Sequence, residues 1–190
     1  MASAALPLLV IVSGAPGSGK TTLAQRLAPA LGLPALLKDD LKETLYDTLG
    51  LPRDQKGSQR LGAASMALLV RIAERLLAAG APCLIEANFQ RGGEALFAPL
   101  LPLARVVQLH CGGDPEVIVR RYAERAERGE RHPGHRDHDA LPRLRDLLAG
   151  GAYEPPILDA PLLCVDTTTA AEYAPDFAAV TAFVKAHAGG

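Results

Sequence analysis

The chain has 190 residues, of which 48% are hydrophobic and 22% are charged, and its formal net charge is -1. This composition is typical of a globular protein and excludes a disordered chain, which has too little apolar surface to offset the entropy of ordering. The near-zero net charge also speaks against a general nucleic-acid binder, because phosphate binding depends on an excess of Lys and Arg.

No targeting or membrane signal is evident in the sequence. The longest apolar stretch, residues 4–12, is shorter than the ~20 residues that a spanning helix needs, and the N-terminal segment lacks the basic residues of a secretory signal. Cys83, Cys111 and Cys164 lie in apolar runs and are predicted to be buried thiols in a reducing compartment. We expect a cytoplasmic monomer or homodimer, with one domain over residues 1–190 and no membrane contact.

Short apolar strands alternate with helices along the chain. We predict strands over residues 8–13, 35–37, 83–86, 106–110 and 162–165. Helical spacing of apolar residues predicts helices that end before Gly32 and that cover 40–49, 54–79, 94–101, 115–128 and 173–186. Strands joined by helices imply an α/β fold, a parallel sheet covered by helices on both faces.

Several residues mark where the predicted helices begin and break. Asp54 and Asp114 stand at N-cap positions, and Asp40 is expected to cap the helix over 40–49. Pro99 is expected to disturb the helix over 94–101. The segment 131–139 is polar and interrupted by Pro133-Gly134, so no helix is predicted there.

The first strand leads into a glycine-rich segment that fits the pattern G-x-x-x-x-G-K-[ST] and opens a helix. Its residues are Gly14, Ala15, Pro16, Gly17, Ser18, Gly19, Lys20 and Thr21. Such a segment curls so that backbone N–H groups point at an anion, and the helix N-terminus adds its dipole. A glycine-rich turn without a ligand is the alternative, but the strand before and the helix after favour a phosphate-binding loop. We predict nucleotide binding by residues 14–22, which include Thr22, with Lys20 on the β- and γ-phosphates and Thr21 on Mg²⁺.

The rest of the sequence narrows the class of P-loop protein. The Asn-Lys-x-Asp motif of GTPases is absent, and the third strand ends in Leu84-Ile85-Glu86 rather than in the adjacent Asp-Glu of motor ATPases. The short chain and an arginine-rich late helix favour a small kinase.

Two carboxylates, Asp39 and Asp40, follow the second predicted strand. Ligands of open α/β sheets bind at the carboxyl ends of the strands, so these residues are expected near the γ-phosphate. A kinase that acts on a hydroxyl benefits from a carboxylate that accepts the hydroxyl proton, and Asp39 is the candidate base. The alternative is that both residues only begin a helix.

Basic residues gather in a predicted lid over about residues 114–139. Arg121, Arg125 and Arg128 share one face of the predicted helix, and Arg121 and Arg125 are the candidate catalytic arginines. A solvated helix with surface ion pairs is the alternative. The histidines at positions 132, 135 and 138 suggest zinc, a polar segment or substrate contact, with His135 the best candidate for contact.

The P-loop, the Asp-Asp-x-Lys segment at 39–42, the third strand and the arginine-rich lid together resemble the zeta-toxin and chloramphenicol phosphotransferase group of P-loop kinases. They also resemble the kinase domain of polynucleotide 5′-kinase. The resemblance implies an adenylate-kinase-like sheet of order 2-3-1-4-5, Asp39 as base, and Lys42 as a contact to the acceptor. Lys42 is a lysine where polynucleotide kinases usually have arginine, so a bidentate phosphate grip is not implied.

Other residues are placed by their position at strand ends. Glu86 is a candidate to hold Mg²⁺ or to position the acceptor, or else it is a carboxylate satisfied by nearby backbone. Asn88 follows it in a loop that can line the acceptor pocket, and Thr167 follows the last strand, where similar kinases border the adenine. Arg128 and His135 are further candidate acceptor contacts.

The sequence therefore predicts an ATP- and Mg²⁺-dependent kinase that phosphorylates a hydroxyl of a small molecule. The acceptor is an antibiotic, a nucleoside-like metabolite or a nucleotide sugar, and a role in antibiotic resistance is implied only by the family. A polynucleotide 5′-hydroxyl kinase and a nucleotide-dependent switch or ATPase without an acceptor are the alternatives. A nucleic-acid partner is not expected, because the net charge does not favour a basic groove.

Overall fold

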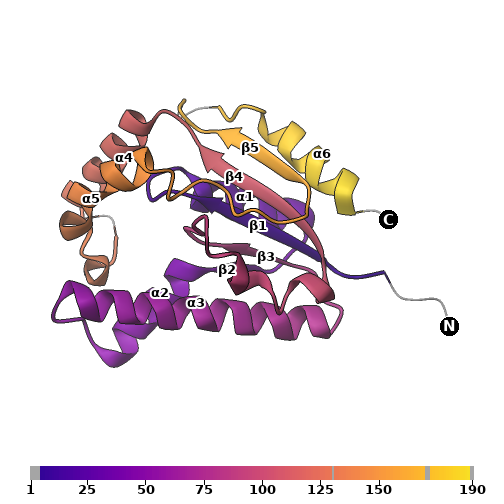
Figure 1. Cartoon of the computed structure of the whole chain (residues 1–190), viewed down its shortest axis with the longest axis horizontal. Coiled ribbons are helices and arrows are strands. Elements are labelled where there is room, and N and C mark those ends of the chain that lie inside the picture. Colours follow the sequence, from indigo (N-terminus) through magenta and orange to yellow (C-terminus); the bar gives the residue numbers. More distant parts are fainter. Residues whose placement is uncertain (1–4, 130, 170–171, 189–190) are drawn as a thin grey trace.

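The computed structural model describes residues 5–129, 131–169 and 172–188. Five parallel strands form one sheet in the order β2-β3-β1-β4-β5, which confirms the predicted topology (Figure 1). The strands are β1 (Leu8–Gly14), β2 (Ala35–Leu37), β3 (Cys83–Glu86), β4 (Arg105–Gly112) and β5 (Leu162–Asp166). The central strand β1 pairs in register with β3 and β4, so that Val10 lies between Leu84 and Val107.

Six helices surround the sheet: α1 (Lys20–Leu31), α2 (Lys38–Leu49), α3 (Gln55–Ala78), α4 (Pro115–Glu127), α5 (Asp137–Ala149) and α6 (Phe177–Ala188), counted over the described residues. Short 3₁₀ helices cover Glu94–Phe97, Leu101–Leu103 and Pro133–His135. Asp54 caps α3 by accepting from the Gly57 N–H at 2.7 Å, and Asp114 caps α4. Both capping predictions are therefore confirmed.

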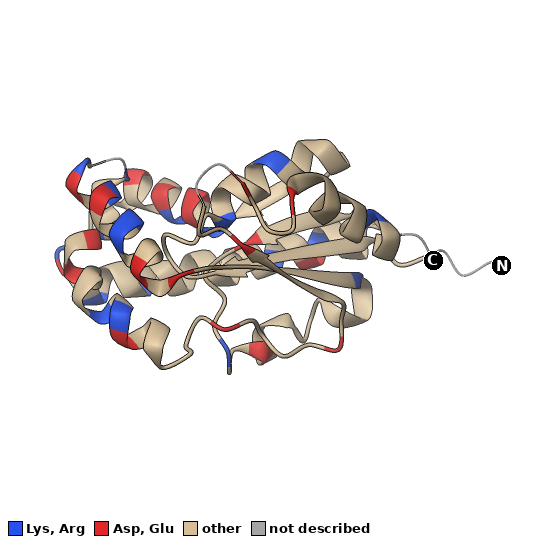
Figure 2. Cartoon of the chain, turned by 90° about the horizontal axis from the view of Figure 1, so that it is seen from above, with Lys and Arg blue, Asp and Glu red and all other residues tan. Residues whose placement is uncertain are grey.

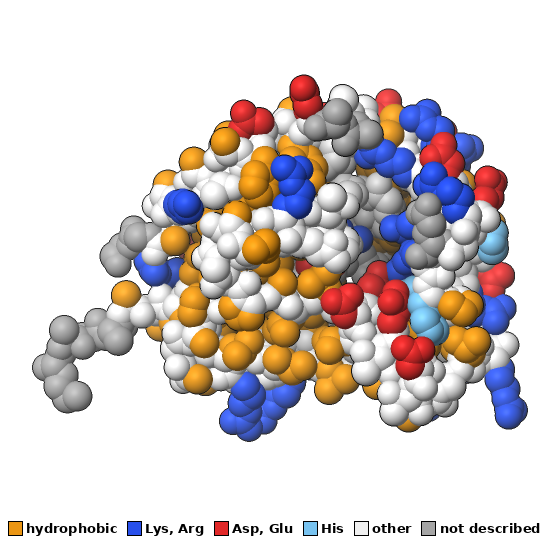
Figure 3. All heavy atoms as spheres, turned by 180° about the vertical axis from the view of Figure 1, so that it is seen from behind, with side chains coloured by type: hydrophobic (Ala, Val, Ile, Leu, Met, Phe, Trp, Pro, Cys, Tyr) orange, Lys and Arg blue, Asp and Glu red, His pale blue; other side chains and the backbone are white. Residues whose placement is uncertain are grey.

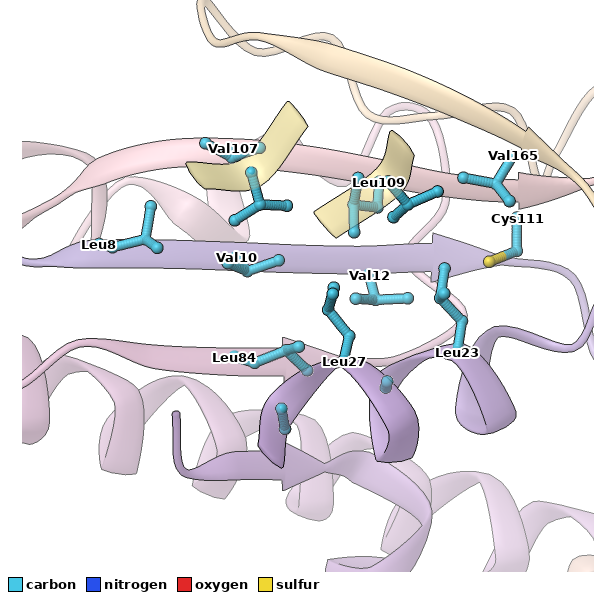
Figure 4. Packing of buried hydrophobic residues seen from close by; sticks show 14 residues of the cluster. Leu8, Val10, Val12, Leu23, Leu27, Leu84, Val107, Leu109, Cys111 and Val165 are labelled. Carbon is cyan, nitrogen blue, oxygen red and sulfur yellow. The ribbon is translucent and has the colours of Figure 1, made fainter. Parts of the chain in front are cut away.

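Alternate residues of β1 pack into two separate cores, because successive side chains of a strand point to opposite faces. Val10 and Val12 pack with Leu23 and Leu27 of α1 and with the apolar side of α6 (Figure 4). Leu9 and Ile11 pack on the other face with α3. Burial on both faces explains why the strand is an unbroken apolar run.

Helix α5 was not predicted from the sequence. It follows Arg136, which has a positive φ of 54°, and it contains Pro142. Proline removes one helical hydrogen bond, yet Leu144 on the same helix is buried and packs against residues of α4. Tertiary packing thus outweighs the unfavourable local signal.

Three smaller predictions are wrong. The predicted helix over 94–101 is two separate 3₁₀ helices, with Pro99 between them. Helix α2 begins at Lys38, directly after β2, so Asp40 lies in its first turn and does not cap it. Cys164 is exposed on β5, whereas Cys83 and Cys111 are buried as expected.

The charged residues are concentrated at the end of the molecule that carries α4 and α5 (Figures 2 and 3). The carboxyl ends of the strands point toward this end (Figure 1). Apolar side chains predominate over the rest of the face in Figure 3. Of the helices in the described part of the chain, none has the length and apolar character needed to cross a membrane.

Candidate functional site

The glycine-rich loop connects the end of β1 to the start of α1. Gly17 has a φ of +86°, and a Cβ placed on it would lie 2.7 Å from the Ile118 carbonyl oxygen of α4, so only glycine fits there. The Ser18 hydroxyl is buried and has no hydrogen-bond partner among the described residues. A curled loop with an unsatisfied polar atom at a helix N-terminus suits the binding of a phosphate group.

Lys20 and Thr21 meet Glu86 at the tip of β3. The Lys20 ammonium lies 3.7 Å from one Glu86 carboxylate oxygen, and the Thr21 hydroxyl donates to the other at 3.3 Å. Burial raises the pKa of the Glu86 carboxyl above its ordinary value, and the Lys20 charge opposes this shift. A hydroxyl and a carboxylate beside a phosphate loop are the oxygen donors that Mg²⁺ prefers, so Thr21 and Glu86 fit a magnesium site.

One cavity of about 180 Å³ joins the P-loop to the start of α2. Lys20 and Thr21 line it on one side, and Asp39 lines it on another. The other predicted residues in its wall are Pro16, Lys42, Glu86, Asn88, Arg125 and His135. The fold thus brings together most of the residues predicted for phosphate, base and acceptor, from segments that are far apart in the sequence. We call this space the reaction cavity.

Asp39 stands in the first turn of α2, where the helix dipole favours a negative charge. Its carboxylate pairs with the Lys38 ammonium at 3.1 Å and with the Arg131 guanidinium. Burial works against ionisation, but the positive charges of Lys38 and Arg131 prevail and hold the pKa of Asp39 well below its usual range. Asp39 is therefore an ionised carboxylate at neutral pH.

Arg131 connects Asp39 to two further groups. Its guanidinium donates to Asp137 at 2.8 Å and to Nδ1 of His135 at 3.0 Å. Because Nδ1 accepts, Nε2 carries the proton and donates to the Glu43 carboxylate at 2.8 Å. Burial, followed by the charge of Arg131, lowers the pKa of His135 to about 3, so the ring is neutral.

The segment 131–135 is docked on α2 and α3. Gly134 lies so close to the ring of Tyr46 that a Cβ would approach the ring to 2.4 Å. The Ser58 hydroxyl donates to the Gly134 carbonyl at 3.1 Å and lies 2.9 Å from the Tyr46 hydroxyl. His132 stacks on Tyr46 and contacts Asp47 at 3.0 Å. These contacts keep Arg131 over the reaction cavity.

The three arginines predicted on one helix face lie in three different places. Arg125 lines the reaction cavity, and its buried Nε has no partner among the described residues. Arg121 instead donates to the carbonyls of Thr167 and Thr168 at 2.6 and 2.8 Å. Arg128 is exposed at the end of α4, and the reaction cavity does not include it.

A separate cavity of about 200 Å³ lies on the other side of the P-loop. Gly17, Gly19 and Thr22 line it together with Arg121 and Thr167. The Thr167 hydroxyl also lies 2.8 Å from the Ser18 carbonyl oxygen, which ties the loop after β5 to the P-loop. Arg121 and Thr167 are thus together, as predicted for nucleotide contacts, but Arg121 is not beside Asp39.

Among the residues that line the reaction cavity, Lys38, Tyr122 and Asp137 were not selected from the sequence, and Arg131 was counted only among the basic residues of the predicted lid. The Tyr122 hydroxyl donates to Asp137 at 2.8 Å, and the other carboxylate oxygen of Asp137 is buried without a partner among the described residues. Leu141, Leu144 and Leu148 at helical spacing were the available signal for α5, and hence for Asp137 at its start. No local pattern indicates that Arg131 pairs with Asp39, 92 residues away.

The histidines do not form a metal centre. His132 and His135 contact different carboxylates, Asp47 and Glu43. Within residues 5–129, 131–169 and 172–188, no group of three or more His, Cys, Asp or Glu side chains is placed to hold a metal ion.

The family of the chain follows from comparison with known proteins. A family model described as an AAA domain (AAA_33) matches residues 9–149, and no curated protein matches the chain. A candidate kinase from Chloroflexus aurantiacus J-10-fl has 36% sequence identity and a TM-score of 0.85, over 96% of this chain and 98% of the other.

Two further solved structures share the fold at lower identity. A gluconokinase from Sinorhizobium meliloti 1021 is 20% identical with a TM-score of 0.53, over 96% of this chain and 92% of the other. A chain of the Pnkp1/Rnl/Hen1 RNA repair complex is 20% identical with a TM-score of 0.52, over 81% of this chain and 49% of the other. On the match to the family model and the 36% identical structure, the chain belongs to the AAA_33 family and has a P-loop kinase-like fold.

Proposed function

We propose that the protein is an ATP- and Mg²⁺-dependent kinase that transfers the γ-phosphate to a hydroxyl of a small molecule. The observation that carries the proposal is that Asp39 and Lys20 line one cavity. A carboxylate in the same cavity as the P-loop lysine can accept the proton of a hydroxyl that attacks a phosphate bound by that lysine.

The reaction is derived from the residues of this chain. The acceptor hydroxyl gives its proton to the Asp39 carboxylate as its oxygen forms a bond to the γ-phosphorus. The bond from that phosphorus to the β–γ bridging oxygen breaks, and ADP leaves. Lys20 and Arg125 stabilise the negative charge that spreads over the transferring group. Bound Mg²⁺, held through Thr21 and Glu86, supplies further charge neutralisation at the phosphates.

The lid role of α4 and α5 belongs to the same proposal. Phosphoryl transfer depends on positioning and on exclusion of water, and arginines that close over the phosphates serve both. Arg125 and Arg131 both line the reaction cavity. The glycine at position 129, between them, offers backbone freedom for motion of this segment.

Three features support a small acceptor. The reaction cavity has about 180 Å³, and its neighbour between α3 and α5 has about 610 Å³, a volume suited to a small molecule. The net charge of -1 does not favour the positively charged groove with which proteins bind a nucleic-acid strand. One structure that shares the fold is a gluconokinase. Kinship with the zeta-toxin and chloramphenicol phosphotransferase group is supported by the Asp-Asp-x-Lys segment at the start of α2.

The proposal is tested by phosphorus NMR of ATP·Mg²⁺ with a panel of hydroxyl compounds, which includes sugars, sugar acids, nucleosides, chloramphenicol and a 5′-hydroxyl oligonucleotide. A new phosphate monoester signal with one class of small molecule is expected. Transfer to the oligonucleotide alone would establish the polynucleotide kinase alternative. Equal release of inorganic phosphate with every compound, and no monoester, would indicate an ATPase and overturn the proposal.

A further inference from the structure

A second cavity of about 610 Å³ adjoins the reaction cavity between α3 and α5. Both cavities share Lys38, Lys42 and Asn88 in their walls, but Lys20 and Thr21 line only the first. The second cavity also differs in charge: of the residues that the structure describes, three basic ones line it (Lys38, Lys42 and Arg143) and no Asp, Glu or His does. Its ligand therefore meets an excess of positive charge.

Lys42 is the most informative of these basic residues. It is only 8% exposed, and its ammonium donates to the Ser58 hydroxyl at 3.2 Å and lies 5.4 Å from the centre of the Tyr46 ring. Among the described residues no carboxylate forms an ion pair with it, whereas Lys38 beside it is paired with Asp39. The carboxylates of Asp39 and Asp137 act on the Lys42 ammonium only from beyond ion-pair distance. A buried ammonium without a carboxylate in direct contact is costly, and an anion brought by a ligand reduces that cost.

The surroundings of Lys42 leave room for such an anion. Gly62 of α3 faces it, and a Cβ at that position would lie 3.6 Å from the Lys42 nitrogen, so a larger side chain would cover the ammonium. Gln55 lines the same cavity, and its buried side-chain oxygen has no partner among the described residues. This oxygen accepts hydrogen bonds, so the site offers a place for a hydroxyl beside the anion.

Arg143 completes the positive lining from α5. It is exposed and forms no ion pair with the described residues, whereas Arg145 on the same helix pairs with Glu116 at 2.8 Å outside this cavity. Met66 and Leu144 supply apolar wall beside it. A carbon skeleton can therefore pack on the wall while a charged group meets the arginine.

We propose, on the basis of the proposed kinase function, that the acceptor is an anionic hydroxy compound. Its carboxylate or phosphate monoester binds Lys42 and Arg143 in the second cavity, while a hydroxyl of the same molecule faces Asp39 in the first. Neutral alcohols lack the group that satisfies Lys42, and cationic amino alcohols are repelled by the basic lining. A small acid or phosphate ester suits a cavity of this volume better than a polynucleotide.

Calorimetric titration of matched probes tests the proposal, with a non-hydrolysable ATP analogue and Mg²⁺ present. The pairs are gluconate with sorbitol, and glucose 6-phosphate with glucose, so that the carboxylate and phosphate sources are separated. In at least one pair, the anionic member is expected to bind about tenfold or more tightly than its neutral twin. Lys42→Met and Arg143→Met should each reduce this preference, and Arg145→Met, the matched control on α5, should keep it.

The outcomes separate this inference from the proposed function. The inference is overturned if neither pair shows a preference for its anionic member, or if neither gluconate nor glucose 6-phosphate binds. It is also overturned if the preference is unchanged in both Lys42→Met and Arg143→Met. Because Arg143 is exposed, its variant is informative even if Lys42→Met fails to fold. A different result would refute the kinase function alone. In that case the anionic compounds still bind preferentially, also to Asp39→Asn, but the wild-type protein transfers phosphate to no compound of the panel.

Discussion

The two sides of the reaction cavity are built in different ways. On the proposed nucleotide side, the phosphate-binding loop lies within residues 14–22, and the local strand–loop–helix connection places it. On the acceptor side, the lining comes from α2, α3, α4 and α5 and from the loops that hold Asn88 and Tyr153. The first is therefore specified by a short motif, and the second by long-range packing. The proposed phosphate site can thus be predicted from nine consecutive residues, whereas the proposed acceptor site depends on how the helices pack together.

The largest effect is expected from the nucleotide side. Lys20→Met removes the charge that we propose to bind the β- and γ-phosphates, and we expect kcat/KM for ATP to fall roughly 10²–10³-fold. Steady-state turnover with the acceptor found by phosphorus NMR measures this loss, and circular dichroism checks the fold. Near-wild-type turnover would show that this loop does not bind the phosphates.

On the acceptor side, Arg125→Met probes the arginine that lines the reaction cavity. We expect kcat to fall about 10²-fold with little change in the KM for ATP, because the charge acts on the transferring group. Arg128→Met is the matched control on the same helix, since Arg128 is exposed outside this cavity. Equal losses of kcat in the two variants would contradict the placement of Arg125.

The docking of residues 131–135 predicts a pH dependence of stability. Because the folded pKa of His135, about 3, lies below its ordinary value of 6.5, the neutral ring stabilises the fold above pH ~6.5. That stability is lost as the pH falls from there toward the folded pKa. Between pH ~7.5 and ~5 the loss that is due to His135 should be about 2 kcal/mol.

Urea unfolding of the wild-type protein and of His135→Gln at the two pH values measures this contribution. His110, which is half-buried, also has a pKa lowered by its partial burial, so both proteins should retain some pH dependence. The difference between the two proteins in how much the free energy of unfolding changes with pH gives the contribution of His135. Identical changes in the two proteins would show that His135 is not held neutral by Arg131 and burial.

A smaller effect is expected from Arg121→Met. Its guanidinium is bonded to the carbonyls of Thr167 and Thr168, on the far side of the P-loop from Asp39. We expect the KM for ATP to rise about tenfold, the effect of about 1.4 kcal/mol in binding, with kcat nearly unchanged. A large loss of kcat would instead support the catalytic role that was predicted for Arg121 from its position on the helix.

The sheet and the phosphate loop were predictable because their signals are local. Apolar runs such as 8–13 and the glycine spacing from Gly14 to Gly19 need no knowledge of the rest of the chain. Helix α5 was missed because Pro142 and the Pro133-Gly134 break outweigh the leucine spacing in a local view. Its stability comes from packing against α4, which no local pattern records.

The acceptor side was predictable in its residue types but not in its pairing. The carboxylate at position 39 and the lysine at position 42 were recognised from strand position and resemblance. The arginine that pairs with Asp39 is separated from it by 92 residues. Three arginines with helical spacing look equivalent in the sequence, yet α4 docks so that only Arg125 of the three lines the reaction cavity.

The most direct measurement compares Asp39→Asn with Asp40→Asn. Asp40 is the next residue on α2 and is exposed, so it controls for loss of one negative charge near the helix N-terminus. If Asp39 accepts the hydroxyl proton, Asp39→Asn should lower kcat for phosphate transfer roughly 10²–10⁴-fold and leave ATP affinity within a few-fold, while Asp40→Asn keeps wild-type turnover. Wild-type transfer by Asp39→Asn, or an equal loss in both variants, would contradict the role of Asp39 as the base.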